Sequence, residues 1–147
     1  MKNYPEKGVY LLEIKLTRSA EIIIGALGEK TFPAGYYFYA GTAQRTLPAR
    51  LKRHYSKNKK FHWHIDYLLA VADLEADLVF TLPKTGECLL SNQLIKIGGK
   101  VIINGFGASD CNCDTHLIYF PLTSDLTKIK AGLLENKKLS KQLSNKN

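Results

Sequence analysis

The stretch "GVYLLEIKL", residues Gly8 to Leu16, decides the fold class because its side chains alternate in character. Glu13 and Lys15 occupy one side of the alternation, and apolar or aromatic residues occupy the other. Successive side chains of a β-strand point to opposite faces, so this period of two predicts a strand with one apolar face. That face carries Tyr10, Leu12, Ile14 and Leu16. The chain therefore begins with a strand of a sheet.

Two segments that follow also have the character of strands. The β-branched run "EIIIGALG", Glu21 to Gly28, comes after a polar turn, so it is expected to form a hairpin with the first strand. The aromatic stretch "GYYFYAGTA", Gly35 to Ala43, supplies a third strand over 36–40, and we expect all three strands to be antiparallel. The alternation of the third strand places Tyr37 and Tyr39 on one face and Tyr36 and Phe38 on the other.

The rest of the chain alternates helices with short strands. Thr46 is a suitable N-cap and Pro48 is tolerated in a first turn, so a helix is expected from Leu47 to Tyr55. The remaining elements are expected as a helix at 63–72, a strand at 76–82, a helix at 87–97, a strand at 116–120 and a capped amphipathic helix at 124–135. The pattern predicts an α+β fold in which helices flank a small, mainly antiparallel sheet.

Length and charge favour one domain with a polyanionic partner. The 147 residues suit a single domain, with the main body at 1–123 and a C-terminal helix and solvated basic tail at 124–147. Lys and Arg number 21 against 13 Asp and Glu, a net charge of +8, which suits nucleic acid. The sequence contains neither an apolar membrane span nor a signal-peptide core, so we expect a cytoplasmic protein.

A basic segment follows the third strand. Positions 45 to 60 contain basic residues and no acidic residue, and on a helix Arg50, His54 and Lys57 would share one face. Phe61 and Trp63 follow, and cations beside aromatic rings are typical of sites for single-stranded or distorted nucleic acid. A solvated basic helix beside core aromatics is the alternative interpretation. The basic residues are Arg45, Arg50, Lys52, Arg53, Lys57, Lys59 and Lys60.

Several short motifs, taken in order, resemble a known family. "GVY" at Gly8–Tyr10, "YAG" at Tyr39–Gly41 and "RLKRH" at Arg50–His54 resemble the GIY-YIG nuclease superfamily. Nearly the whole chain up to Phe120 resembles one branch more closely, a domain of unknown function found alone or fused to endonuclease III in prokaryotes. The stretches that carry this closer resemblance are "FPAGYYFYAGTA", "RLKRH", "HWHIDYLL", "GEC" and "GFGASDCNCDTHL".

The resemblance implies a three-stranded antiparallel core with added strands, and phosphodiester cleavage with one divalent cation, Mg²⁺ or Mn²⁺. Tyr10 and Tyr39 would stand on adjacent strands, Arg50 would reach them from the helix, and His54 would line the same cleft. A phenol can orient or deprotonate water when nearby cations lower its pKa, and a guanidinium can bind the scissile phosphate. Gly41 would let the backbone approach the substrate. Nucleic-acid contacts are assigned to Arg45, Arg53, Lys57, Lys59, Lys60, Trp63 and His64.

One position departs from the superfamily pattern. A metal-binding glutamate is expected one turn before a Leu-Ile pair, and Ser91 stands there, before Leu94 and Ile95. Glu87 lies one turn earlier on the same helix face and can supply an oxygen ligand, so we assign it to the metal. An acid placed at a helix N-terminus, where the helix dipole favours it, is the alternative.

The loop "SDCNCDTH" contains residue types that bind zinc. Cys111, Cys113 and His116, with Cys88 as a fourth ligand, would make a zinc site, but their spacing lacks a usual finger pattern and zinc is not expected. Buried thiols in a tight loop are the alternative, with Asp110 or His116 at the border of the cleft.

These observations leave three functional hypotheses. The first is a metal-dependent endonuclease that acts on DNA rather than RNA, with a role in DNA repair beside a glycosylase partner that the family association suggests. The second is a nucleic-acid-binding module that kept the fold and lost cleavage, as the serine at position 91 suggests. The third is a zinc-stabilised adaptor for protein interactions, which predicts bound zinc and little affinity for nucleic acid.

Overall fold

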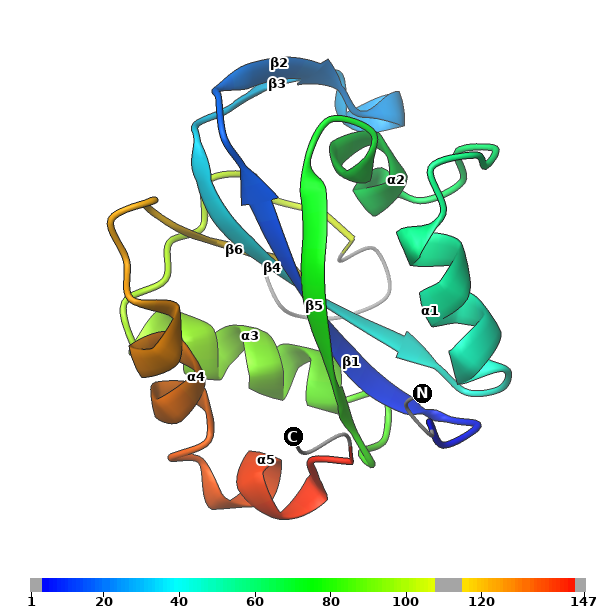
Figure 1. Ribbon diagram of the computed structural model, residues 1–147, viewed down its shortest axis with the longest axis vertical. Coiled ribbons are helices and arrows are strands. Elements are labelled where there is room, and N and C mark those ends of the chain that lie inside the picture. Colours follow the sequence, from blue (N-terminus) through cyan, green and yellow to red (C-terminus); the bar gives the residue numbers. More distant parts are fainter. Residues whose placement is uncertain (1–3, 108–114, 145–147) are drawn as a thin grey trace.

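An antiparallel sheet with the strand order β5-β1-β4-β6 runs through the centre of the molecule (Figure 1). The computed structural model of the chain describes residues 4–107 and 115–144. Strands β1 (Gly8–Leu16) and β4 (Gly35–Ala43) pair over their full length, and β5 (Asp73–Phe80) and β6 (Leu117–Phe120) form the two edges. The prediction of an α+β fold with a mainly antiparallel sheet is confirmed.

Helices cover both faces of this sheet, which gives three layers (Figure 1). Helices α1 (Leu47–Tyr55) and α2 (His64–Leu69) bury one face of β1, the face that the alternation predicts to be apolar. Helices α3 (Gly86–Lys96), α4 (Leu126–Leu133) and α5 (Lys137–Gln142) contribute to a second hydrophobic core on the opposite face. The central strands are therefore buried on both sides.

The aromatic stretch of β4 is divided between these two cores. Tyr37 and Tyr39 belong to the core beneath α1 and α2, whereas Phe38 belongs to the other core and Tyr36 packs at its margin. This division follows the alternation of side chains along a strand. As a result, Tyr39 shares a sheet face with Tyr10 of the neighbouring strand.

The predicted hairpin between β1 and the following β-branched run is wrong. Strand β2 (Ala20–Ile23) pairs with β3 (Glu29–Phe32) in a separate two-stranded sheet, while β1 pairs with β4 and β5. The chain reverses in a 3-10 turn, Gly25–Leu27, where Gly25 has a φ of 44° that residues with side chains rarely adopt. This turn lies inside the run that was expected to be one strand, so the run pairs with the segment after it.

Helix α1 has its predicted bounds, but its predicted N-cap is wrong. Thr46 has a φ of 52°, and its hydroxyl donates to the carbonyl of Arg45 instead of accepting a hydrogen bond from a helical N–H. Helix α2 ends at Leu69 and β5 begins at Asp73, each three residues earlier than predicted. Strand β5 starts early because its pairing with β1 extends as far as Asp73.

The C-terminal segment is attached to the edge of the sheet. Leu139 of α5 is buried in the second core. The N–H of Thr81 donates to the carbonyl of Gln142 at 2.8 Å, and the N–H of Ser144 donates to the carbonyl of Val79 at 2.7 Å. Residues 137–144 are therefore not frayed, because backbone hydrogen bonds and an apolar contact hold them, while their lysine side chains are exposed to solvent as expected.

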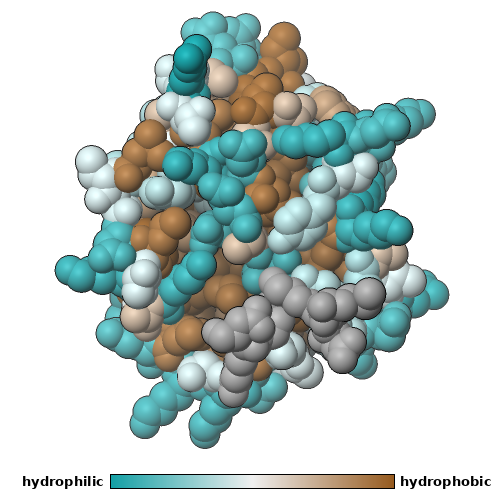
Figure 2. Space-filling model, in the orientation of Figure 1, coloured by the Kyte–Doolittle hydropathy of each residue, from teal (hydrophilic) through white to brown (hydrophobic). Residues whose placement is uncertain are grey.

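The molecular surface is mixed in polarity. Long hydrophilic side chains project around the outline of the face in Figure 2, and hydrophobic surface shows between them. No helix of residues 4–107 and 115–144 is both long and apolar enough to cross a membrane. The large hydrophobic side chains that are exposed in this part of the chain are Ile23, Tyr55, Phe61, Val71, Ile95 and Leu122.

Candidate functional site

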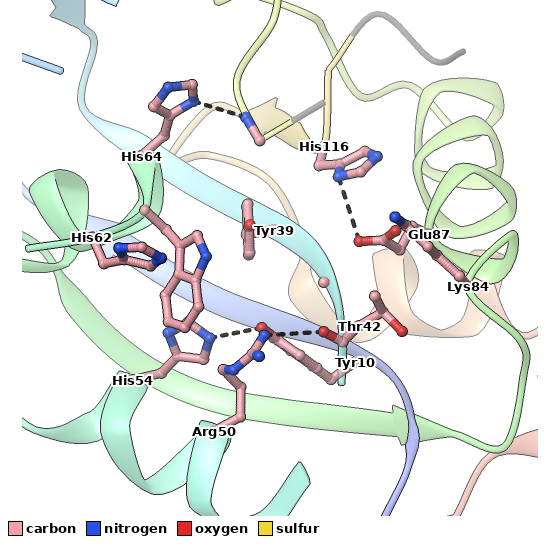
Figure 3. Close-up of a pocket in the computed structure, with 13 residues that line it drawn as sticks. Tyr10, Tyr39, Thr42, Arg50, His54, His62, His64, Lys84, Glu87 and His116 are labelled. Atoms are coloured by element: carbon pink, nitrogen blue, oxygen red, sulfur yellow. Dashed lines mark hydrogen bonds and ion pairs between the residues drawn. The ribbon is translucent and has the colours of Figure 1, made fainter. Parts of the chain in front are cut away.

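A cleft of about 290 Å³ separates the α1–α2 side of the molecule from the N-terminal end of α3 (Figure 3). All four histidines of the sequence line it, together with two tyrosines, an arginine and a glutamate. Such convergence of polar groups in one concave site is the usual mark of a binding or catalytic site. The described lining residues are Tyr10, Tyr39, Gly41, Thr42, Arg50, His54, His62, Trp63, His64, Lys84, Glu87, Gly107 and His116.

The floor of the cleft is formed by the two tyrosines that share a sheet face. Tyr10 stands opposite Gly41 in the β1–β4 ladder, and Tyr39 stands two residues away along β4. A Cβ atom on Gly41 would lie 2.5 Å from the hydroxyl oxygen and from Cζ of Tyr10. Gly41 therefore makes room for the Tyr10 ring, which is a more local role than the substrate approach expected from the sequence.

Tyr10 and His54 form a hydrogen-bonded pair. The hydroxyl oxygen of Tyr10 lies 2.7 Å from Nε2 of His54, and both side chains are buried. Burial, helped by the charge of Lys59, lowers the pKa of His54 to about 3. Burial also raises the pKa of Tyr10 to about 12, although Arg50 acts in the opposite direction. The expectation that nearby cations lower this phenol's pKa is wrong for the ligand-free chain, because burial outweighs them.

The guanidinium of Arg50 is held at the wall of the cleft by two contacts. Its Nη1 donates to the carbonyl of Thr42 at 3.1 Å, and its Cζ lies 4.4 Å from the ring centroid of Trp63. Cζ of Arg53 lies 4.5 Å from the same ring, which is the sole tryptophan of the chain. Cation–π contacts of this kind restrain a guanidinium while its charge is kept. Arg50 is thus positioned before any ligand binds.

The opposite wall carries a carboxylate. Glu87 lies in the first turn of α3, only 6% exposed, and its Oε2 is 3.7 Å from Nδ1 of His116. Burial, helped by the charge of Lys84, lowers the pKa of His116, so at neutral pH its ring is neutral. Ser91, one turn further along α3, is buried and has no hydrogen-bond partner among the described residues.

His64 links α2 to the third side of the cleft. Its Nδ1 accepts a hydrogen bond from the N–H of Gly107 at 3.0 Å, and burial lowers its pKa. Because Nδ1 accepts this hydrogen bond, the single N–H hydrogen of the neutral His64 ring is on Nε2. The contact ties two segments more than forty residues apart to the same site.

Residues 9–139 match the family model described as Domain of unknown function DUF123. The chain belongs to this family. The matched range includes every described residue that lines the cleft, so the site is part of the DUF123 domain itself. Comparison with curated proteins gives no match, and neither does comparison with solved structures.

The cleft of this DUF123 domain contains most of the residues that the sequence predicts to be catalytic or metal-binding. It contains few of the basic residues that the sequence assigns to nucleic-acid contacts. Lys57 lies beyond the end of α1, so the face expected to join it to Arg50 and His54 does not extend that far. Its ammonium donates to the carbonyls of Leu69 and Ala72. The gathered residues are Tyr10, Tyr39, Arg50, His54, Trp63, His64, Glu87 and His116.

Two further predicted contacts serve the structure of the domain. Arg53 donates two hydrogen bonds of 2.9 Å to Asp66, and Lys59 donates to the carbonyls of Arg53 and His54. Arg45 and Lys60 are exposed and do not line the cleft. Asp110, Cys111 and Cys113 lie outside the described residues. His116, the last residue of the loop prediction, lines the cleft.

Sequence reasoning missed several lining residues, of which Thr42, His62 and Lys84 carry polar side chains. For Asp66 the sequence favours packing or capping, and the structure adds that its carboxylate organises the α1–α2 side. Asp66 stands three residues after the N-cap Trp63, and its carboxylate accepts the N–H of that residue, which is half of a capping box. This spacing was the available signal, whereas nothing in the sequence indicates that Lys84 reaches the cleft.

Asp66 should make the stability of the domain depend on pH. Burial opposes its ionisation, but hydrogen bonds from Arg53 and from the N–H groups of Trp63 and His62 hold its pKa below the ordinary value of 3.8. The resulting stability is complete above that value and is lost as pH falls through the lower, folded-state pKa. We expect Asp66→Asn to lower the free energy of unfolding at neutral pH by about 2–4 kcal/mol.

Urea unfolding of the wild type and of this variant over a series of pH values measures the effect. The gap between the two proteins should narrow as pH falls below 3.8. Asp73→Asn, on the exposed edge strand, is the matched control and should leave the unfolding midpoint near that of the wild type. A gap that stays constant from neutral to acidic pH would contradict the assignment to Asp66.

Proposed function

We propose that this DUF123 domain is a metal-dependent endonuclease of the GIY-YIG type that hydrolyses nucleic-acid phosphodiesters. The observation that supports it best is one cleft in which the Tyr10–His54 pair and Arg50 face Glu87 across an open space (Figure 3). A phenol, a guanidinium and a carboxylate are the groups that the superfamily resemblance requires. Their placement on β1, α1 and α3 agrees with the order of the motifs in the sequence.

Glu87 is the residue that would hold the divalent cation. Among the described residues no group of three His, Cys, Asp or Glu side chains could bind a metal ion, so a closed protein cage does not fit. Mg²⁺ keeps several water ligands and is commonly bound through one or two carboxylates plus substrate phosphates, which suits a single carboxylate in an open cleft. When bound, such an ion acts as a Lewis acid toward the phosphoryl oxygens.

The remaining side chains have separable roles in this proposal. The positioned guanidinium of Arg50 binds the scissile phosphate through forked hydrogen bonds. Neutral Tyr10 donates its hydroxyl hydrogen to Nε2 of His54, which leaves the phenol oxygen free to accept a hydrogen bond from the attacking water. The negative charge of the bound phosphate raises the pKa of His54, so the water's proton can pass through the phenol to the imidazole. Water adds to phosphorus, one ester P–O bond breaks, and the leaving oxygen takes up a proton.

The partner and the setting belong to the same proposal. A net charge of +8 supports a nucleic-acid partner, and we propose DNA rather than RNA, with a role in repair beside a glycosylase and a cytoplasmic location. One observation favours a second candidate, a nucleic-acid-binding module without cleavage. Ser91 occupies the place where the resemblance expects the metal-binding carboxylate, and its hydroxyl is buried.

A cleavage assay separates the two candidates. The purified chain is incubated with single-stranded, duplex and branched DNA and with RNA, in Mg²⁺, in Mn²⁺ and in EDTA. We expect cleavage that requires the metal ion and that falls about 10²-fold in Arg50→Ala, since a preorganised donor to the reacting phosphate is lost. Lys52→Ala is the matched control, because Lys52 is an exposed cation of the same helix outside the cleft.

Three outcomes have different meanings. Metal-dependent cleavage that Arg50→Ala impairs and Lys52→Ala does not supports the nuclease. Salt-sensitive binding without cleavage in any metal ion supports the binding module. Neither binding nor cleavage with any of the substrates contradicts both candidates.

A further inference from the structure

One exposed aromatic residue immediately precedes, along the chain, two residues that line the cleft. Phe61 is 43% exposed, between Lys60 and His62, which are exposed as well. His62 and Trp63, the next residues along the chain, line the cleft. An exposed phenylalanine alone needs no explanation, so the way in which its loop is held decides what it can do.

The loop that carries Phe61 is fixed by buried polar contacts. The N–H groups of His62 and Trp63 donate to Asp66 at 2.8 and 2.9 Å, and Asp66 is fully buried. Arg53, which also pairs with Asp66, donates to the carbonyl of Lys60 at 2.8 Å. The backbone on both sides of Phe61 is therefore tied to one buried carboxylate. A ring on such a loop is presented in a set position, which lowers the entropy cost of binding.

Phe61 and the rings near it differ in the groups that already contact them. Phe61 meets Tyr67 edge to face, at 4.9 Å between centroids and an interplanar angle of 66°. Trp63 is contacted by the guanidiniums of Arg50 and Arg53. The sequence pointed to Trp63 for stacking, but in the structure its ring holds the arginine that faces the cleft.

We propose that Phe61 is a stacking platform for an unpaired nucleobase, and that the substrates of this domain contain single-stranded nucleotides. This inference rests on the proposed function, because the phosphate next to that base would lie in the cleft. A base within a duplex is already stacked on both sides, so only an unpaired or extruded base can offer a face to Phe61. No acidic residue occurs between positions 45 and 60, so the approach is favourable for a polyanion.

Binding measured without metal ion tests the inference apart from catalysis. Fluorescence anisotropy of a labelled oligonucleotide, single-stranded and as a duplex of the same sequence, is followed in EDTA over a range of salt concentrations. We expect Phe61→Ala to weaken single-strand binding about tenfold and duplex binding hardly at all. The dependence of affinity on salt should not change, because no charge is removed.

Two variants complete the experiment. Phe61→Trp keeps an aromatic face and should retain single-strand affinity. Val71→Ala removes another exposed apolar side chain, 53% exposed, beyond the end of α2 and should have no effect. Equal losses for single strand and duplex in Phe61→Ala, or no loss for either, would overturn the platform while leaving the nuclease proposal intact. Absence of binding to any nucleic acid by the wild type would overturn the platform, and the nuclease proposal would fall with it only if cleavage in Mg²⁺ and Mn²⁺ were absent as well.

Discussion

Replacing Tyr10 with phenylalanine is expected to lower the rate of metal-dependent cleavage by about 10²–10⁴-fold, the usual contribution of a positioned proton-transfer group. The change removes one oxygen and keeps the ring that packs over Gly41, so the sheet should be little disturbed. What is lost is the hydrogen bond of 2.7 Å to His54 and the lone pairs that would hold water against the phosphate. Single-turnover cleavage at saturating substrate measures the chemical step directly.

Tyr37→Phe is the matched control for this prediction. Tyr37 lies on the same face of the sheet as Tyr10, but it does not line the cleft. Its hydroxyl donates a hydrogen bond to the carbonyl of Pro33. This variant should lose some stability and keep its cleavage rate. The assignment of Tyr10 would be wrong if the two variants lost activity to the same degree, or if Tyr10→Phe cleaved at the wild-type rate.

Replacing Glu87 with glutamine is expected to remove the metal dependence of the domain. The substitution is nearly isosteric, and it replaces the one carboxylate that lines the described cleft with a neutral amide. We expect cleavage to fall by about 10²–10³-fold, since the ion supplies several kcal/mol of charge stabilisation in the transition state. Direct titration with Mn²⁺, followed by electron paramagnetic resonance, should show weaker binding in the variant without reference to activity.

Glu75→Gln provides the control for charge. Glu75 is an exposed acid on β5 outside the cleft, and its replacement should alter neither Mn²⁺ binding nor cleavage. Wild-type Mn²⁺ affinity in Glu87→Gln would show that the carboxylate serves only as a favourable charge at the start of α3. That result would favour the interpretation in which the acid belongs to the helix N-terminus.

The fold and the floor of the site were readable from local patterns. Alternation of side chains along β1 and β4 predicts the two strands. It also predicts that Tyr10 lies on the apolar face of β1 and that Tyr39 shares a face of β4 with Tyr37. The spacing of Leu47 and Leu51 predicts α1, which brings Arg50 to those tyrosines. Side-chain periodicity depends on neighbours along the chain, so a single sequence contains this information.

The features that the sequence did not predict depend on contacts between segments that are not read from one local pattern. The pairing of β2 with β3 depends on a glycine turn inside an apolar run. The carboxylate of Glu87 on α3 contacts the ring of His116, which lies twenty-nine positions further along the chain. No local sequence pattern predicts this contact. The ammonium groups of Lys57 and Lys59 bind carbonyls of the domain itself, because the end of α1 and the loop after it bring those oxygens within reach.

The contact between Trp63 and Arg50 has an optical consequence. Because the chain has a single tryptophan, its indole emission comes entirely from one wall of the cleft. A phosphate that draws the guanidinium away from the ring, 4.4 Å from its centroid, changes the surroundings of the fluorophore. We therefore expect the indole emission of the unlabelled protein to change when a phosphate ligand fills the cleft, whether or not that ligand is cleaved.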